Sequence, residues 1–117
     1  MGWFFRTSKK EFDPIDFSVL KTDMHSHLLP NLDDGSSSIE DSIILVNQLN
    51  KLGFDSLIIT PHIMSDHYKN TPDTINKALD KLKSEISEIN VKVSAAAEYY
   101  VDYDFKQDIR KKKFLTF

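Results

Sequence analysis

Apolar and polar positions follow two kinds of pattern along most of this chain. Short apolar runs predict strands over residues 19–25, 54–60 and 91–98. Residues 57–59 are continuously apolar, which is typical of a strand covered on both faces. Between the runs, two longer segments carry apolar residues three and four positions apart, as amphipathic helices do. This order predicts an α/β fold in which helices alternate with parallel strands.

The first helical segment carries signals at both of its ends. Ser37, followed three residues later by Glu40, predicts a capping box at the start. The apolar stripe then runs from Ile39 to Leu52. Gly53 follows the stripe directly and is placed to end the helix.

The second helical segment is expected to begin after Thr71, with Pro72 at the first helical position. Its apolar repeat extends to Ile89, and Asn90 is expected to close it. A further short helix is expected around residues 104–112.

Composition narrows the class of protein. The 117 residues are 40% hydrophobic and 28% charged, which suits one globular domain with a modest core. The net charge of -3 argues against a nucleic-acid partner and against broad attraction to an anionic membrane. There is no cysteine, so disulfides, thiolate ligands and a cysteine nucleophile are excluded. A reducing compartment, the cytoplasm, is the expected location.

Residues 1–18 are interpreted as an N-terminal arm, and residues 19–117 as the domain. The first six residues are too short and too soon interrupted by charge to form a signal peptide or a membrane span. Trp3, Phe4 and Phe5 form an aromatic cluster in the arm. It is expected to pack on its own domain, with contact to another subunit or to a membrane surface as the alternatives. A homo-oligomer is therefore left open.

Histidine and carboxylate side chains gather where the predicted strands end. His25 and His27 lie at the first end, and side chains two apart on a strand share one face, roughly 6.5 Å apart along it. His62 follows the second strand and Glu98 ends the third. Because the carboxyl ends of parallel strands meet at one edge of the sheet, these side chains are expected to lie together.

Such a cluster predicts a metal-dependent hydrolase. Imidazole and carboxylate ligands without thiolate suit Zn²⁺, Fe or Mn²⁺, and the carboxylate share favours Mn²⁺. Ions held there would turn a bound water into a hydroxide nucleophile for phosphate ester hydrolysis without a covalent intermediate. Each residue also has an ordinary alternative. The two strand histidines could be solvated, His62 could cap a helix, and Glu98 could pair with a lysine.

Four motifs stand out: Asp23-Met24-His25-Ser26-His27-Leu28-Leu29-Pro30, Asp33-Asp34-Gly35, Ile59-Thr60-Pro61-His62 and Ala97-Glu98-Tyr99-Tyr100. Together they resemble the early motifs of the PHP superfamily. They are closest to its bacterial tyrosine-protein phosphatase branch, the CpsB/CapC type found with capsule and exopolysaccharide genes. The resemblance implies a distorted (β/α)7 barrel with up to three metal ions, often Mn²⁺. It also implies attack by a metal-held hydroxide on phosphotyrosine in a protein, typically a bacterial tyrosine kinase.

The resemblance also implies which residues bind metal. By position, His25 and His27 would bind one ion. Glu98 would bridge that ion to a second one. Asp34 and His62 would bind the third.

Other residues near these motifs receive different roles. The resemblance disfavours Asp33 as a direct ligand. His67 and Lys69 are candidates for contacting the substrate phosphate, with a solvated loop as the alternative.

Part of the family pattern has no counterpart in this chain. The family's remaining ligands, a further Glu, a His and a late Asp-x-His, are not found here. The resemblance therefore covers only the N-terminal half of the barrel. Three parallel strands cannot close a barrel, so an open strand edge and exposed apolar surface are expected. We expect an incomplete metal site and little or no phosphatase activity from the chain by itself.

Two other functions stay open at this stage. Metal ligands do not choose the substrate, so a PHP-type phosphoesterase acting on a small phosphorylated metabolite, such as histidinol phosphate or a nucleotide, is one alternative. A non-catalytic assembly module, acting through the aromatic arm or the open sheet edge, is the other.

Overall fold

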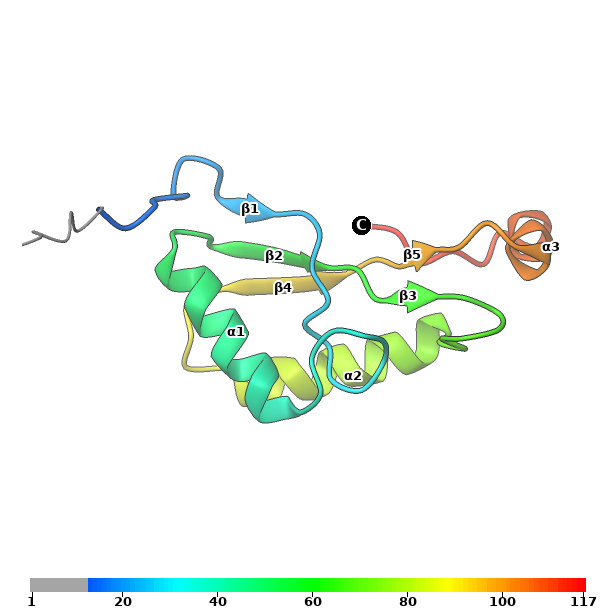
Figure 1. Cartoon of the computed structure of the whole chain (residues 1–117), viewed down its shortest axis with the longest axis horizontal. Helices are drawn as coiled ribbons and strands as arrows, with labels where there is room; N and C mark the ends of the chain where they lie inside the picture. The colour runs from blue at the N-terminus through cyan, green and yellow to red at the C-terminus, as the bar shows by residue number, and fades with distance from the viewer. Residues whose placement is uncertain (1–12) are drawn as a thin grey trace, which may run out of the picture.

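The structure is a computed structural model that describes residues 13–117. Its centre is a three-stranded sheet of β1 (Thr22–Asp23), β2 (Ser56–Ile59) and β4 (Lys92–Ala95) in the order β1-β2-β4 (Figure 1). Both strand pairs are parallel. The predicted parallel α/β fold is therefore confirmed.

Two short strands continue beyond this sheet and were not predicted. β3 (His62–Ile63) and β5 (Glu98–Tyr99) pair in parallel, with His62 opposite Glu98. Pro61, which has no N–H to donate, lies where β2 gives way to β3. Its carbonyl still accepts a hydrogen bond from the Glu98 backbone N–H at 2.9 Å. The two short strands thus place His62 and Glu98 side by side, just beyond the ends of β2 and β4.

The strand expected over residues 19–25 is the largest error in the prediction. Only Thr22–Asp23 form a strand, whereas Val19 is 84% exposed and lies in a turn. That turn is closed by a hydrogen bond from Leu20 N to Phe17 O at 2.9 Å. Lys21 then has a φ of 62°, which an extended strand cannot accommodate. The two histidines consequently lie beyond the strand rather than on it.

The first helix, α1 (Ile39–Lys51), begins one residue later than predicted. Its N-cap is Ser38, whose hydroxyl accepts a hydrogen bond from Asp41 N at 3.1 Å. The third helical position is therefore Asp41 and not Glu40, so the predicted capping box is wrong. Gly53 follows the helix with a φ of 110°, as the prediction of a glycine stop requires.

The second helix, α2 (Pro72–Glu85), begins as predicted and ends early. Thr71 is the N-cap, and it exchanges hydrogen bonds with Thr74 in a capping box. The C-cap is Ile86 and not Asn90. The apolar repeat continues past the helix because the following turn still packs Ile89 against the core. The third helix, α3 (Tyr103–Lys111), agrees with the expected range.

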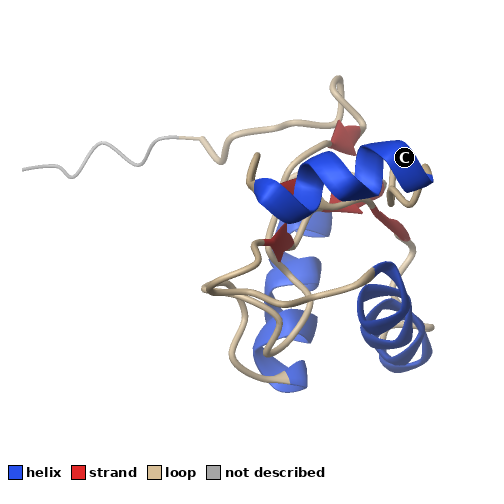
Figure 2. Ribbon diagram, turned by 90° about the vertical axis from the view of Figure 1, so that its right-hand side faces the viewer, coloured by secondary structure: helices blue, strands red, loops and turns tan. Residues whose placement is uncertain are grey.

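Both α1 and α2 lie on one side of the sheet, and the core lies between these helices and the strands (Figures 1 and 2). Leu57 and Ile59 face the helices and are fully buried. Ile58 is only half-buried and, by alternation, lies on the other face, beside exposed Ser94 on β4. The expectation that this strand is covered on both faces is therefore wrong for the described residues.

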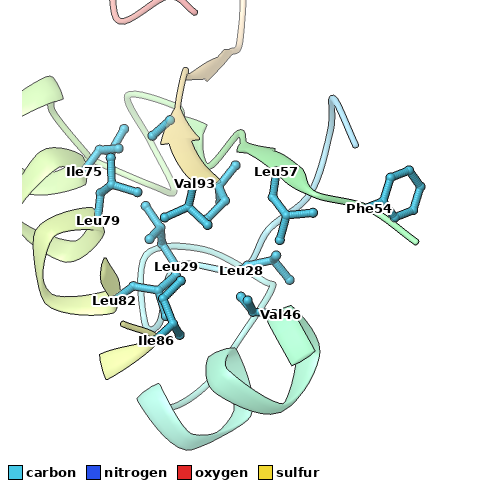
Figure 3. Close-up of a cluster of buried hydrophobic side chains, with 12 residues drawn as sticks. Leu28, Leu29, Val46, Phe54, Leu57, Ile75, Leu79, Leu82, Ile86 and Val93 are labelled. Carbon is cyan, nitrogen blue, oxygen red and sulfur yellow. The ribbon is translucent and has the colours of Figure 1, made fainter. Parts of the chain in front are cut away.

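The loop after β1 also contributes to the core. Leu28 and Leu29 are 5% and 1% exposed, and they lie between the helices and the strands (Figure 3). Most of the other buried side chains come from α2 with its C-cap and from β2 and β4, and they include Ile75, Leu79, Leu82, Ile86 and Val93. Burial of the leucine pair fixes the start of the loop that follows the two histidines.

Apolar side chains are also exposed on the described surface, as expected for an open sheet. They include Ile44 on α1, Ile109 on α3 and Phe117. Within the described sheet, β1 and β4 each have one neighbour. None of the helices among residues 13–117 is long and apolar enough to span a bilayer. The aromatic cluster of residues 3–5 lies outside the described residues, and the division at residue 18 stays a prediction.

Candidate metal centre

The structure brings the predicted metal-binding residues together at the carboxyl end of the sheet. His25 and His27 lie in the segment after β1, and Asp34 lies in the loop that follows. His62 begins β3 and Glu98 begins β5, directly opposite each other. The β3–β5 pairing therefore brings together residues that are 36 positions apart in the sequence.

One carboxylate oxygen forms the centre of the cluster. Glu98 Oε2 lies 3.2 Å from His27 Nε2, 3.4 Å from His62 Nδ1 and 3.6 Å from His25 Nε2. This oxygen is buried and accepts no hydrogen bond within the described part of the chain. A buried carboxylate oxygen without a partner is costly, and a cation would satisfy it. The surrounding residues therefore fit a metal ion.

The candidate ligand atoms form two overlapping groups. His25, His27 and Glu98 make one group, and their ligand atoms lie within 4.8 Å of one another. The second group satisfies the same criterion and consists of His27, Asp33, Asp34 and His62. His27 is shared, so the groups adjoin. Imidazole nitrogen and carboxylate oxygen are suitable donors for Zn²⁺, Mn²⁺ or Fe.

Thr60 orients one of the histidines and was missed by sequence reasoning. Its hydroxyl lies 2.8 Å from His25 Nδ1 and 3.4 Å from the Ser26 carbonyl. A histidine that binds metal usually makes a hydrogen bond through its other ring nitrogen. The contact leaves His25 Nε2 facing Glu98. The sequence signal was weak, since Thr60 is only a hydroxyl residue at the end of an apolar run.

Asp33 makes the densest set of hydrogen bonds in the centre. Its Oδ2 accepts from His27 Nδ1 at 2.7 Å and from the His62 backbone N–H at 2.9 Å. Its Oδ1 accepts from the Gly35 backbone N–H at 3.0 Å. Burial by itself would raise the pKa of Asp33, but these hydrogen bonds outweigh it and hold the pKa below its ordinary value. Asp33 is therefore kept as a carboxylate.

Gly35 allows the loop to fold back onto His27. A Cβ at Gly35 would lie 2.2 Å from the His27 carbonyl oxygen and 2.5 Å from its Cβ. The next residue, Ser36, donates its backbone N–H to the same carbonyl at 3.0 Å. Only glycine permits this approach, and the approach holds Asp33 and Asp34 beside the histidines.

Tyr68 and Asn70 support His62, and sequence reasoning gave neither a role. The Tyr68 ring stacks on the His62 ring with centroids 5.6 Å apart. Asn70 donates hydrogen bonds to the His62 carbonyl at 2.8 Å and to the Leu32 carbonyl at 2.7 Å. Asn70 thus links β3 to the loop that carries Asp34.

The two predicted phosphate-contacting residues are not members of either ligand group among the described residues. His67 is exposed. Lys69 lines a cavity of about 350 Å³ together with Ile63 and Tyr99. Those two residues alternate with His62 and Glu98 along the paired strands, so they point to the opposite face. Substrate binding by His67 and Lys69 stays a prediction.

Comparison with known proteins agrees with this geometry. The model of the family described as "Capsular polysaccharide synthesis, CpsB/CapC" matches residues 21–117. The tyrosine-protein phosphatase YwqE of Bacillus subtilis is 31% identical over 96 residues, which is 80% of this chain and 38% of YwqE. The CapC protein of Staphylococcus aureus is 28% identical over 93 residues, covering 78% of this chain and 36% of CapC. The chain therefore spans less than two fifths of these relatives.

A solved structure gives the same assignment at the level of the fold. It comes from work on YwqE from Bacillus subtilis and CpsB from Streptococcus pneumoniae, described as metal-dependent tyrosine phosphatases. It is 31% identical, with a TM-score of 0.73 over 81% of this chain and 39% of that chain. The expected resemblance is confirmed, and the chain belongs to the CpsB/CapC family.

Proposed function

We propose that this chain supplies part of the metal centre of a tyrosine-protein phosphatase that hydrolyses phosphotyrosine in proteins. The observation that carries the proposal is Glu98 Oε2, which is buried between three imidazole nitrogens and accepts no hydrogen bond from residues 13–117. Family membership supports the reaction class, because a solved relative is described as a metal-dependent tyrosine phosphatase.

The geometry supports a specific division of the ligands. His25 and His27 present Nε2 atoms 3.4 Å apart and would hold one ion. Glu98 would bridge that ion to a second. Asp34 Oδ1 and His62 Nε2, 3.5 Å apart, would hold a further ion. We propose Mn²⁺ as the resident ion because two of the five proposed ligands, Asp34 and Glu98, are carboxylates.

Bound divalent ions in such a site supply an acidified water and positive charge beside the phosphoryl oxygens. The protein's own contribution is to hold the ligands in place before substrate arrives. Thr60 and Asp33 restrain the two Nε2 atoms, and Asn70 restrains the backbone of His62. The substrate would be a phosphotyrosine protein, for which we propose a bacterial tyrosine kinase.

The chain spans under two fifths of its curated relatives, so further groups are expected to take part in the reaction. We therefore expect the 117-residue chain to bind Mn²⁺ but to show little or no phosphatase activity by itself. Mn²⁺-dependent hydrolysis of a phosphotyrosine peptide that is unaffected by His25→Ala would contradict both the proposed centre and this expectation.

The ligand assignment is tested by calorimetric titration of the metal-free chain with Mn²⁺. Glu98→Gln should abolish saturable binding at the first group, since the amide carries no charge to offer the ion. Glu88→Gln is the matched control, because Glu88 is exposed and lies after α2. Equal Mn²⁺ binding by both variants would overturn the assignment.

A further inference from the structure

We propose that Asp33 is the positioning residue that joins the two ligand groups into one centre and is not itself a metal ligand. This inference rests on the proposed metal-dependent function. It concerns how the ligands are aligned in the free protein. It therefore makes predictions that can be measured without substrate.

The contacts of Asp33 involve three separate parts of the centre. Its side chain is 1% exposed, and both carboxylate oxygens accept hydrogen bonds. The donors are the ring of His27, the backbone of His62 and the backbone of Gly35. Every segment that supplies a ligand before β4 is therefore tied to this one carboxylate.

Each of the three hydrogen bonds has a separate consequence. The bond from His27 fixes its hydrogen on Nδ1, because a carboxylate can only accept. It thereby leaves the Nε2 lone pair directed toward Glu98. The bond from the His62 N–H holds the start of β3 against the loop after β1. The bond from Gly35 N closes the turn that contains Asp34.

The neighbouring aspartate has the opposite environment. The Asp34 side chain is 68% exposed, and its Oδ1 faces His62 Nε2. An ion could bind Asp34 without breaking a hydrogen bond described for that side chain. An ion on Asp33 Oδ2 would compete with donors from both His27 and His62. Of the two aspartates, Asp34 is therefore the ligand and Asp33 the support.

An asparagine cannot reproduce these contacts. Three donors are shared between two carboxylate oxygens, whereas the asparagine amide offers one acceptor oxygen and an NH₂ donor. Asp33→Asn must therefore place a donor against a donor on one side of the group. Either the Gly35 turn or the link between His27 and His62 is lost.

The test compares Asp33→Asn with Asp16→Asn. Asp16 is an exposed aspartate that accepts the backbone N–H two residues later, from Ser18, at 2.8 Å. Asp33 makes the same local turn with Gly35, so the control removes an equivalent charge from an equivalent turn. In the metal-free wild-type chain, imidazole ¹⁵N spectra at a pH where His27 is neutral should place its hydrogen on Nδ1. Asp33→Asn should lose either this fixed tautomer or the hydrogen-exchange protection of the Gly35 amide, and Asp16→Asn should keep both.

Calorimetry with Mn²⁺ then separates positioning from ligation. Asp33→Asn should weaken Mn²⁺ affinity at both groups by about 10–100-fold with the same number of ions bound. One ion fewer, with the remaining affinity unchanged, would show that Asp33 is a ligand and would overturn the proposal. Wild-type affinity would also overturn it.

The tautomer measurement keeps the proposal falsifiable if the variant does not fold. In that case the wild-type spectrum decides, and a His27 hydrogen on Nε2 would overturn the inference. This measurement needs neither metal nor substrate. Its result therefore does not depend on whether the protein hydrolyses phosphotyrosine. Failure of the positioning role and failure of the proposed function are therefore distinguishable.

Discussion

At the scale of single residues, the centre depends on one very close backbone approach. Gly35→Ala would force its Cβ against the His27 backbone, where neither partner is a flexible side-chain end. We expect the free energy of unfolding in urea to fall by about 1–3 kcal/mol, the usual cost of overpacking. Ser37→Ala, at an exposed site two residues along the same loop, is the control. Equal stability of the two variants would argue against the close approach.

A second residue-scale prediction concerns Asp102, the N-cap of α3. Hydrogen bonds from the Ser65 hydroxyl, from Phe105 N and from Ser65 N lower the pKa of Asp102 from 3.8 to about 2. Because the folded pKa is depressed, the stabilisation is present above about pH 4 and is lost as the pH falls toward about 2. The ¹³C signal of the carboxyl should titrate at about pH 2.

The same pH window should appear in hydrogen exchange. Protection of the Ser65 and Phe105 amides should decrease between about pH 4 and about pH 2 in the wild-type chain. An Asp102→Asn variant cannot titrate there and serves as the control. A carboxyl midpoint near 3.8 would contradict the hydrogen-bonded arrangement.

The residues of the centre divide into those that sequence can identify and those that it cannot. His25, His62 and Glu98 were identifiable because each lies near a predicted strand end, and parallel strands bring such ends together. Thr60 was not identifiable, because its contact with His25 joins residues 35 positions apart through a single hydroxyl. Hydrogen bonds of this kind leave no periodic pattern in the sequence.

At the scale of elements, cap residues predicted helix starts better than apolar runs predicted strands. Thr71 and Pro72 placed the start of α2 correctly because their preference is local backbone chemistry. The apolar pair at residues 19–20 mispredicted a strand because apolar side chains also occur in exposed turns. The register of β3 against β5 required the tertiary structure.

The cap of α2 gives an element-scale prediction. Thr71→Ala removes the hydroxyl that accepts the Thr74 backbone N–H at 3.2 Å. The free energy of unfolding should fall by about 0.5–2 kcal/mol in a urea titration. Ser87→Ala, in the exposed turn after the helix, should change it little. A loss in the control as large as in Thr71→Ala would show that the cap is not the cause.

At the scale of the whole molecule, one helical layer packs on one face of the sheet. The predicted alternation of strands and helices was correct apart from the additional short strands β3 and β5. The predicted cover on both faces was wrong for the described residues. An apolar run indicates burial on average and does not show which face is covered. This face-specific packing explains why Leu57 is fully buried while Ile58 is half-buried.

The hydrophobic core between the helices and the sheet gives a prediction about the stability of the whole chain. Leu82 on α2 is fully buried, so Leu82→Ala should destabilise the chain by about 2–5 kcal/mol in urea unfolding. Ile44→Ala on α1 is the control, because that side chain is 54% exposed. A small effect at Leu82 would contradict the core described between the helices and the sheet.

The proposed metal centre is tested most directly by asking whether ions bind at His25 and His27. Zn²⁺ is a suitable diamagnetic probe, and imidazole ¹⁵N spectra of the labelled chain report which ring nitrogen binds it. We predict that the Nε2 signals of His25 and His27 shift with saturating Zn²⁺, while exposed His67 keeps its signals. Shifts confined to His67, or no saturable shift at His25 and His27, would contradict the proposed metal centre.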